Sequence, residues 1–297
     1  MKKNKLKLKH KHKAKKIMGR VVLHTLVTII VLFTLAPFAW LVISSVSTKS
    51  DLTRTPFQLF RSPPTFENYS AMLLGTSRST TDAASRFLSS MQNSLYVALI
   101  VTAISLVVGV LAAYAFSRFR FRGKNTLLNS TLFTQMIPPI ATIIPMYIIM
   151  LYLNLLDNKN ALIIVYLSFV LPFLIWIMKG YIDGIPGELE ESAMIDGCGQ
   201  LGAFFRVVLP VASTGIAATL IFAFIISWNE FFYALNFTST TASKTLPVLL
   251  TEFSSKYGSD FILASTAGVL AGIPPVLISL VFQRFIISGL SAGAVKG

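Results

Sequence analysis

The sequence predicts an all-α membrane protein that crosses the bilayer six times. Of its 297 residues, 54% are hydrophobic and only 13% are charged, whereas soluble domains carry about 25% charged residues. The hydrophobic residues form continuous blocks long enough for the roughly 20 helical residues that a bilayer core requires. Helices satisfy their own backbone groups there. We expect the six transmembrane helices at residues 21–45, 92–116, 127–153, 161–180, 213–236 and 262–287.

The basic residues set the expected orientation. The net charge is +14, and ten of the 26 lysines and arginines lie in residues 1–20. Because cytoplasmic loops are enriched in Lys and Arg, residues 1–20 form a basic cytoplasmic tail and residues 288–297 end on the same side. We expect the tail to contact membrane lipid, not nucleic acid. The first block exceeds the apolar core of a signal peptide and contains Pro37 and Trp40, so it is expected to remain as a span.

Two polar segments lie on the predicted external side. Residues 46–91 are rich in Pro, Ser and Thr and predict a loop or a small cap. Residues 237–261 are either a solvated loop or a contact for a soluble external partner. Between and after them, residues 92–287 form a core of five spans with short connectors.

Prolines interrupt the third predicted span. Pro138, Pro139 and Pro145 lack the amide donor that a continuous helix needs, so they break or kink it. Such breaks persist at membrane depth only where neighbouring protein or a wet cavity accepts the freed carbonyls. The prolines are therefore consistent with either a packing kink or a translocation path.

A charged amphipathic segment, residues 181–212, separates the fourth and fifth spans. Glu188, Glu190 and Glu191 suit the first turn of a short helix, where the helix dipole favours negative charge. Gly197 suits the left-handed position that ends it. These features predict a helix that lies along the cytoplasmic face.

A second short helix is expected directly after it. The apolar residues of this helix recur at the spacing of one stripe, and Pro210 is expected to end it. The stripe consists of Leu201, Phe204, Phe205 and Val208. Lipid-binding helices favour basic polar faces, whereas this segment begins acidic. Docking into a groove of another protein is therefore the better interpretation.

These residues also carry a family resemblance. Glu191-Ser192-Ala193-x-x-Asp196-Gly197, followed by Val207-x-Leu209-Pro210, resembles the EAA motif of ABC importer permeases, although Ser192 stands where the family has alanine. Three other stretches are similar to the carbohydrate, maltose-type branch: Met136-Ile137-Pro138-Pro139 with Ile144-Pro145, Trp228-Asn229-Glu230-Phe231-Phe232, and the tail Gly289–Gly297. The resemblance covers residues 20–297 and implies the type I ABC importer permease fold.

The resemblance implies a multi-pass protein of the prokaryotic plasma (inner) membrane that transports sugars or oligosaccharides. Its implied partners are two ATP-binding subunits, a second permease subunit and an extracytoplasmic sugar-binding protein. ATP and Mg²⁺ would bind the ATPase, leaving this chain without a cofactor, a metal site or catalytic residues. Its implied ATPase-docking residues are Glu191, Ser192, Ala193, Asp196, Gly197, Leu209 and Pro210. Independently, the chain contains no phosphate-binding G-x-x-x-x-G-K-[ST] loop.

Polar residues within the spans are few. Glu230 falls toward the outer end of the fifth span, where a solvated interfacial position is favoured over one that lines a substrate path. Sugars need hydrogen-bonding and aromatic side chains. The candidates for a path are Gln135, Tyr147, Asn229, Glu230 and Tyr233.

An ion-coupled secondary carrier and a membrane scaffold without transport activity remain the alternatives. The scarcity of intramembrane charges argues against the carrier.

Overall fold

The computed structural model describes residues 2–48, 51, 63–75, 82–255 and 258–294. The predicted all-α class is confirmed: helices form nearly all of the regular structure in this part of the chain. Its one sheet pairs two strands of two residues each, β1 (Ser254–Ser255) and β2 (Gly258–Ser259), in antiparallel register.

Four helical stretches among the described residues are long and apolar enough to cross a membrane. They are Lys16–Ser45 within α1 (Lys2–Ser45), α4 (Ala83–Arg118), α7 (Lys159–Asp183), and Phe261–Phe285 within α14 (Phe261–Ala294). Two bent pairs pass the same test: α5 (Lys124–Met136) with α6 (Pro139–Tyr152), and residues Gln200–Val211 with α11 (Ser213–Trp228). The structure thus has four spans, or up to six if each bent pair counts as one.

Both predicted tails continue the neighbouring helices. The basic residues after Met1 belong to α1, which runs without interruption from Lys2. At the other terminus α14 extends to Ala294, and residues 295–297 lie outside the described residues. The second span also begins earlier than predicted, at Ala83.

The third predicted span is two helices, not one. The axes of α5 and α6 differ by 101°, and the chain between them is extended at Ile137 and Pro138. Each of these residues precedes a proline, which disfavours the α conformation. Pro145, by contrast, is accommodated inside α6. The proline pair therefore produces the predicted break.

The fifth predicted span is also interrupted, which the sequence reasoning missed. α11 ends at Trp228, and a separate helix, α12 (Phe232–Phe237), follows after a short non-helical link. Both of these predicted spans thus consist of two helices joined by a short non-helical link.

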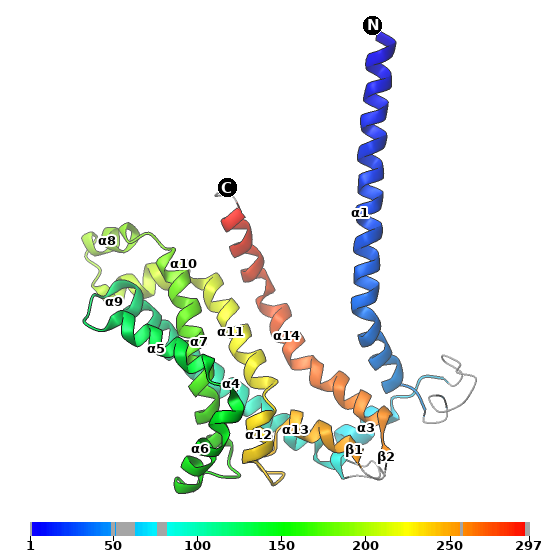
Figure 1. Ribbon diagram of the computed structural model, residues 1–297, viewed down its shortest axis with the longest axis vertical. Helices are drawn as coiled ribbons and strands as arrows, with labels where there is room; N and C mark the ends of the chain where they lie inside the picture. The colour runs from blue at the N-terminus through cyan, green and yellow to red at the C-terminus, as the bar shows by residue number, and fades with distance from the viewer. Residues whose placement is uncertain (1, 49–50, 52–62, 76–81, 256–257, 295–297) are drawn as a thin grey trace.

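The ends of the chain and the charged segment lie on the same side of the helical core. In Figure 1 the N-terminus is at the top, and the C-terminal end of α14 and helix α8 (Glu188–Ile195) lie below it at the upper end of the remaining helices. α6, α12, α13 (Leu246–Leu250) and the strands lie at the bottom. This arrangement agrees with both termini and the charged segment on the cytoplasmic side.

The core forms around α4, which packs against α7 and α11. α14 packs against α11 and, near Leu41 and Ser45, against α1. Most of α1 stands apart from the other helices (Figure 1). Its apolar side chains from Ile17 to Trp40 are exposed. In the predicted external segment, helix α3 (Glu67–Leu74) packs on α4 and α14, as expected of a small cap.

Gly109 permits close packing of α4 against α7. An added Cβ would lie 2.3 Å from Leu174 Cδ2, and both residues are buried. We expect Gly109→Ala to destabilise the protein by about 1–3 kcal/mol through overpacking. The control Gly272→Ala adds a Cβ with nothing within 4 Å of it and should be neutral or stabilising. Thermal unfolding in detergent measures both; equal midpoints would contradict this packing argument.

Candidate functional site

The charged segment begins with the predicted short helix. α8 carries Glu188, Glu190 and Glu191 in its first turn. Gly197 follows its C-cap with φ +89°, where a side chain would strain the backbone. The Cys198 amide donates to Ala193 O at 3.0 Å and the Gly197 amide to Met194 O at 3.1 Å. This pattern is a Schellman motif and confirms the predicted left-handed glycine.

The second half of the segment differs from the prediction. α9 (Gln200–Ala203) continues through a π-helical turn, Phe204–Val208, into α10 (Leu209–Val211). This helix ends at Val211, one residue after Pro210, so the predicted stop before the fifth span is displaced by a single residue. The bend comes after Val211 and measures 74°.

Only two of the four residues of the predicted apolar stripe pack against the core. Phe204 and Val208 are fully buried, whereas Leu201 and Phe205 are 71% and 58% exposed. The exposed pair joins an outward surface on α8, where Ile195 is 86% exposed. An apolar surface of this kind beyond the end of the bundle is typical of a protein contact.

The seven predicted docking residues are distributed along this surface. Glu191, Ser192, Asp196, Gly197 and Pro210 are exposed, while Ala193 and Leu209 are half-buried. The Ser192 hydroxyl donates to Glu188 O at 2.8 Å, so the serine folds back on its own helix. The structure therefore leaves the acidic side chain of Glu191 available to another molecule.

Glu190 behaves differently from the other two glutamates. Its side chain turns inward and accepts hydrogen bonds from Arg118 and Tyr114 of α4. The sequence predicted that all three glutamates lie in the first turn and that Glu191 docks, but it did not predict the inward contact of Glu190. Spacing alone cannot separate neighbouring residues of a helical turn unless the position of the core is known.

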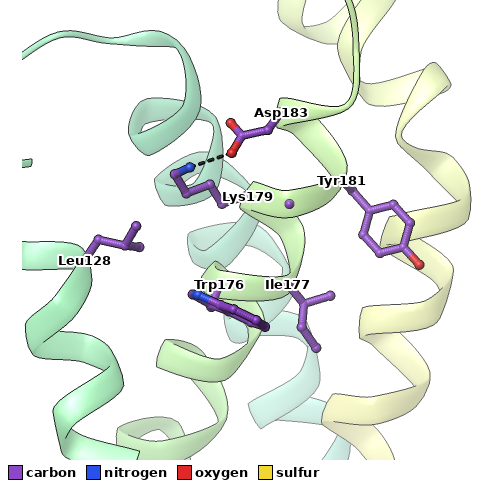
Figure 2. Close-up of a pocket in the computed structure, with 7 residues that line it drawn as sticks. Leu128, Trp176, Ile177, Lys179, Tyr181 and Asp183 are labelled. Carbon is purple, nitrogen blue, oxygen red and sulfur yellow. Dashed lines mark hydrogen bonds and ion pairs between the residues drawn. The ribbon is translucent and has the colours of Figure 1, made fainter. Parts of the chain in front are cut away.

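A pocket of about 500 Å³ lies beside the C-terminal end of α7, the end that precedes α8 (Figure 2). Leu128 of α5 and Trp176, Lys179 and Asp183 of α7 contribute to its wall. Its two charged groups pair with each other, Lys179 Nζ lying 2.5 Å from Asp183 Oδ2. These two charges therefore offset each other in the wall of the pocket.

A second cavity, of about 450 Å³, lies where the two interrupted spans meet. Three predicted path residues line it: Gln135, Glu230 and Tyr233. The other lining residues are Thr134, Ile137, Pro139, Thr142, Met146, Ser168, Phe169 and Phe232. Two predicted residues are not among them: Asn229 is exposed, and Tyr147 packs against Phe237 with ring centroids 6.0 Å apart.

Glu230 organises one wall of this cavity. Its Oε1 accepts from the Tyr233 amide at 2.8 Å and its Oε2 from the Ala234 amide at 3.1 Å. The carboxylate thus caps the first turn of α12, whose amides lack helical partners. The structure places this half-buried side chain in the cavity wall, and its predicted solvated, interfacial position stays a prediction.

Aromatic rings and further polar groups form the rest of the cavity wall. The Phe169 and Tyr233 rings stack at 5.9 Å, and the Tyr233 hydroxyl lies 2.8 Å from Thr142 Oγ1. Gln135 Nε2 donates to Phe169 O at 2.8 Å. An aromatic face beside hydroxyl and carboxylate groups is suited to a polyhydroxylated ligand.

Asp157 joins the two connectors at the opposite end of the molecule. Its carboxylate accepts from the amides of Ser239 and Thr240, at 2.8 and 3.0 Å, and from the Ser243 hydroxyl. Its own amide donates to Phe237 O at 2.9 Å. The turn between α6 and α7 is therefore held against the end of α12, a contact that the sequence reasoning missed.

We expect Asp157→Asn to destabilise the protein by about 1–2 kcal/mol, since it removes charge-assisted hydrogen bonds. Burial opposes ionisation, but the donors from Ser243, Thr240 and Ser239 outweigh it and lower the pKa of Asp157. A depressed folded-state pKa gives stability above the unfolded pKa of about 3.9, lost only as pH falls further. The contribution of Asp157 to the stability of the wild type should therefore be constant between pH 5 and 8 and should fall only in more acidic solution. An unchanged midpoint for Asp157→Asn would contradict the assignment.

Comparison with known proteins identifies the family. A model described as "binding-protein-dependent transport system inner membrane component" matches residues 105–291. The chain belongs to this family. Together with the apolar helices, membership makes the permease an integral protein of the prokaryotic inner membrane.

Relatives of this permease align along most of its length. The sulfoquinovosyl glycerol transport system permease protein SmoH of Agrobacterium fabrum is 34% identical over 263 residues, covering 89% of each chain. The trehalose transport system permease protein SugB of Mycobacterium tuberculosis is 35% identical over 275 residues, covering 91% of this chain and 95% of its own. The resemblance to ABC importer permeases drawn from the sequence motifs is confirmed.

Solved structures support the fold. A chain of a bacterial ABC transporter involved in the import of the acidic polysaccharide alginate superposes with a TM-score of 0.74 at 24% identity. The match covers 91% of this chain and 97% of that one. The predicted permease fold is therefore confirmed.

Proposed function

We propose that this permease is the transmembrane subunit of an ATP-driven, binding-protein-dependent importer of sugars or oligosaccharides. One observation carries the proposal: a short acidic helix, closed by Gly197 in a left-handed turn, presents Glu191 beyond the cytoplasmic end of the bundle. The names of the relatives, which are permeases for sulfoquinovosyl glycerol and trehalose transport, favour a carbohydrate cargo.

The energy is supplied by partner chains in this proposal. Two ATP-binding subunits hold ATP and Mg²⁺, and one of them receives the exposed surface of α8. Glu191 forms a charge-assisted hydrogen bond with a basic residue of that subunit. Closure of the two ATP-binding subunits then moves the docking segments together and rocks the spans between inward- and outward-facing states.

The cavity at Glu230 is the proposed sugar path. Phe169 and Tyr233 present the stacked aromatic face, and Thr142 presents a hydroxyl. An extracytoplasmic sugar-binding protein delivers the cargo, and a second permease subunit completes the pathway. The exposed apolar surface of α1 is available for lipid or for that second subunit.

Reconstitution into proteoliposomes tests the function. We expect labelled disaccharide uptake, with trehalose or maltose as probes, only when the partner ATPase, the second permease, the binding protein and internal ATP are all present. An ion-coupled secondary carrier would instead transport with this chain alone under an ion gradient. Uptake without ATPase, or ATP-independent uptake, would reject the proposal.

A further inference from the structure

An ion pair between a buried glutamate and a half-buried arginine joins the docking helix to the longest core helix. Glu190 of α8 is 5% exposed, whereas Glu188 and Glu191 beside it are exposed. Its Oε1 lies 2.5 Å from Arg118 Nε, and its Oε2 accepts from the Tyr114 hydroxyl at 2.9 Å. Both carboxylate oxygens are therefore fixed by residues of α4.

The same arginine also holds the connector that precedes α8. Arg118 Nη2 donates to Ile185 O at 2.8 Å while Nε contacts Glu190. A guanidinium can do this because its donors are arranged in a rigid fork, unlike the single ammonium of lysine. One side chain at the end of α4 thus fixes the docking helix in both position and direction.

Contacts around this pair extend the connection to the rest of the segment. The ring of Tyr114 packs 4.7 Å from that of Phe204, in the π-helical turn. Ser117 of α4 donates to Asp183 Oδ1 at 2.6 Å, at the end of α7. The last turns of α4 therefore contact the end of α7, the connector that follows it, α8 and the π-helical turn.

α4 in turn packs along α7, which carries Ser168 and Phe169 into the cavity wall. A continuous set of packed elements thus runs from the docking surface to the proposed sugar path. Breaking a buried pair leaves an uncompensated charge, so the pair strongly favours one relative position of its two helices. Paired surface charges would not impose such a constraint.

We infer that Tyr114, Arg118 and Glu190 form a latch that transmits displacement of α8 to α4 and so to the cavity wall. They are positioning residues and contact neither ATP nor sugar. This inference rests on the proposed function, and concerns how much sugar is moved for each ATP hydrolysed. The other role that this pair could have is to keep the docking surface folded.

The reconstituted complex separates these two roles. In Arg118→Ala, the ATPase should still co-purify through Glu191 and hydrolyse ATP, but sugar taken up per ATP should fall about fivefold or more. In Arg118→Lys the sugar taken up per ATP should fall less, because lysine keeps the positive charge but lacks the forked donors of the guanidinium. The swap Arg118→Glu with Glu190→Arg should recover part of the ratio. Arg120→Ala, an exposed arginine at the same end of α4, is the matched control and should keep the wild-type ratio.

Three results would overturn the latch. An unchanged ratio in Arg118→Ala would show that the pair transmits nothing. Loss of ATPase co-purification, with uptake and hydrolysis falling together, would show that the pair only maintains the docking surface. If Arg118→Ala does not accumulate in the membrane, a wild-type ratio in Arg118→Lys would reject the latch. Absence of ATP-driven uptake in the wild type would instead reject the proposed function itself.

Discussion

Glu191→Lys is expected to abolish ATP-driven sugar uptake and to release the ATPase during purification. The carboxylate is exposed on the docking surface, and its replacement places a positive charge against a basic partner residue. Losing one member of a close interfacial charge pair costs about 2–5 kcal/mol. Since 1.4 kcal/mol is a factor of ten, the Kd for the ATPase should rise at least about 30-fold.

Glu67→Lys is the matched control for this change. Glu67 is also exposed and also lies in the first turn of a helix, α3, but in the predicted external segment. Both substitutions carry the same unfavourable interaction with a helix dipole, about 0.3–1 kcal/mol. Only the docking variant should lose the ATPase. Wild-type affinity in Glu191→Lys would contradict the docking role.

Glu230→Ala is expected to lower uptake by about tenfold or more while leaving the ATPase bound. The carboxylate caps the first turn of α12 with both oxygens, and removing a cap costs about 0.5–2 kcal/mol. The freed amides of Tyr233 and Ala234 would move the wall of the cavity that holds the stacked aromatic rings. Initial uptake rates at saturating binding protein measure the effect.

Glu230→Gln distinguishes capping from direct charge recognition. The amide oxygen still accepts one hydrogen bond, so a capping role predicts partial uptake in Glu230→Gln and much lower uptake in Glu230→Ala. Equal loss in both variants would mean that the negative charge itself is required. Normal uptake in both would remove Glu230 from the pathway.

The sequence predicted those features that depend on local chemistry. Consecutive prolines forbid a continuous helix wherever they occur, so the break at Pro138 was predictable. The left-handed turn at Gly197 was predictable because glutamates mark the start of a short helix and Gly197 lies where that helix would end. Four of the predicted hydrophobic blocks, at residues 21–45, 92–116, 161–180 and 262–287, coincide with long apolar helices of the described residues, because bilayer thickness sets their length.

The features that were missed depend on which side of an element meets the core. Glu190 and Glu191 are adjacent and chemically identical, yet only Glu190 faces Arg118. The break before α12 contains no proline and depends on a cap supplied by Glu230. Asp157 meets Ser243 across two connectors distant in the sequence. Such pairings arise from tertiary packing and leave no periodic signal.

The sole cysteine of the chain gives the most direct test of the docking surface. Cys198 follows Gly197 at the end of α8 and is half-buried, with its Sγ 3.7 Å from Arg206 Nη1. Maleimide labelling of the permease, alone and in complex with the ATPase, reports whether this turn becomes covered. We predict that the ATPase slows labelling of wild-type Cys198 and that Glu191→Lys restores the rate seen without ATPase. Equal labelling rates with and without a bound ATPase would contradict the proposal that α8 is the docking site.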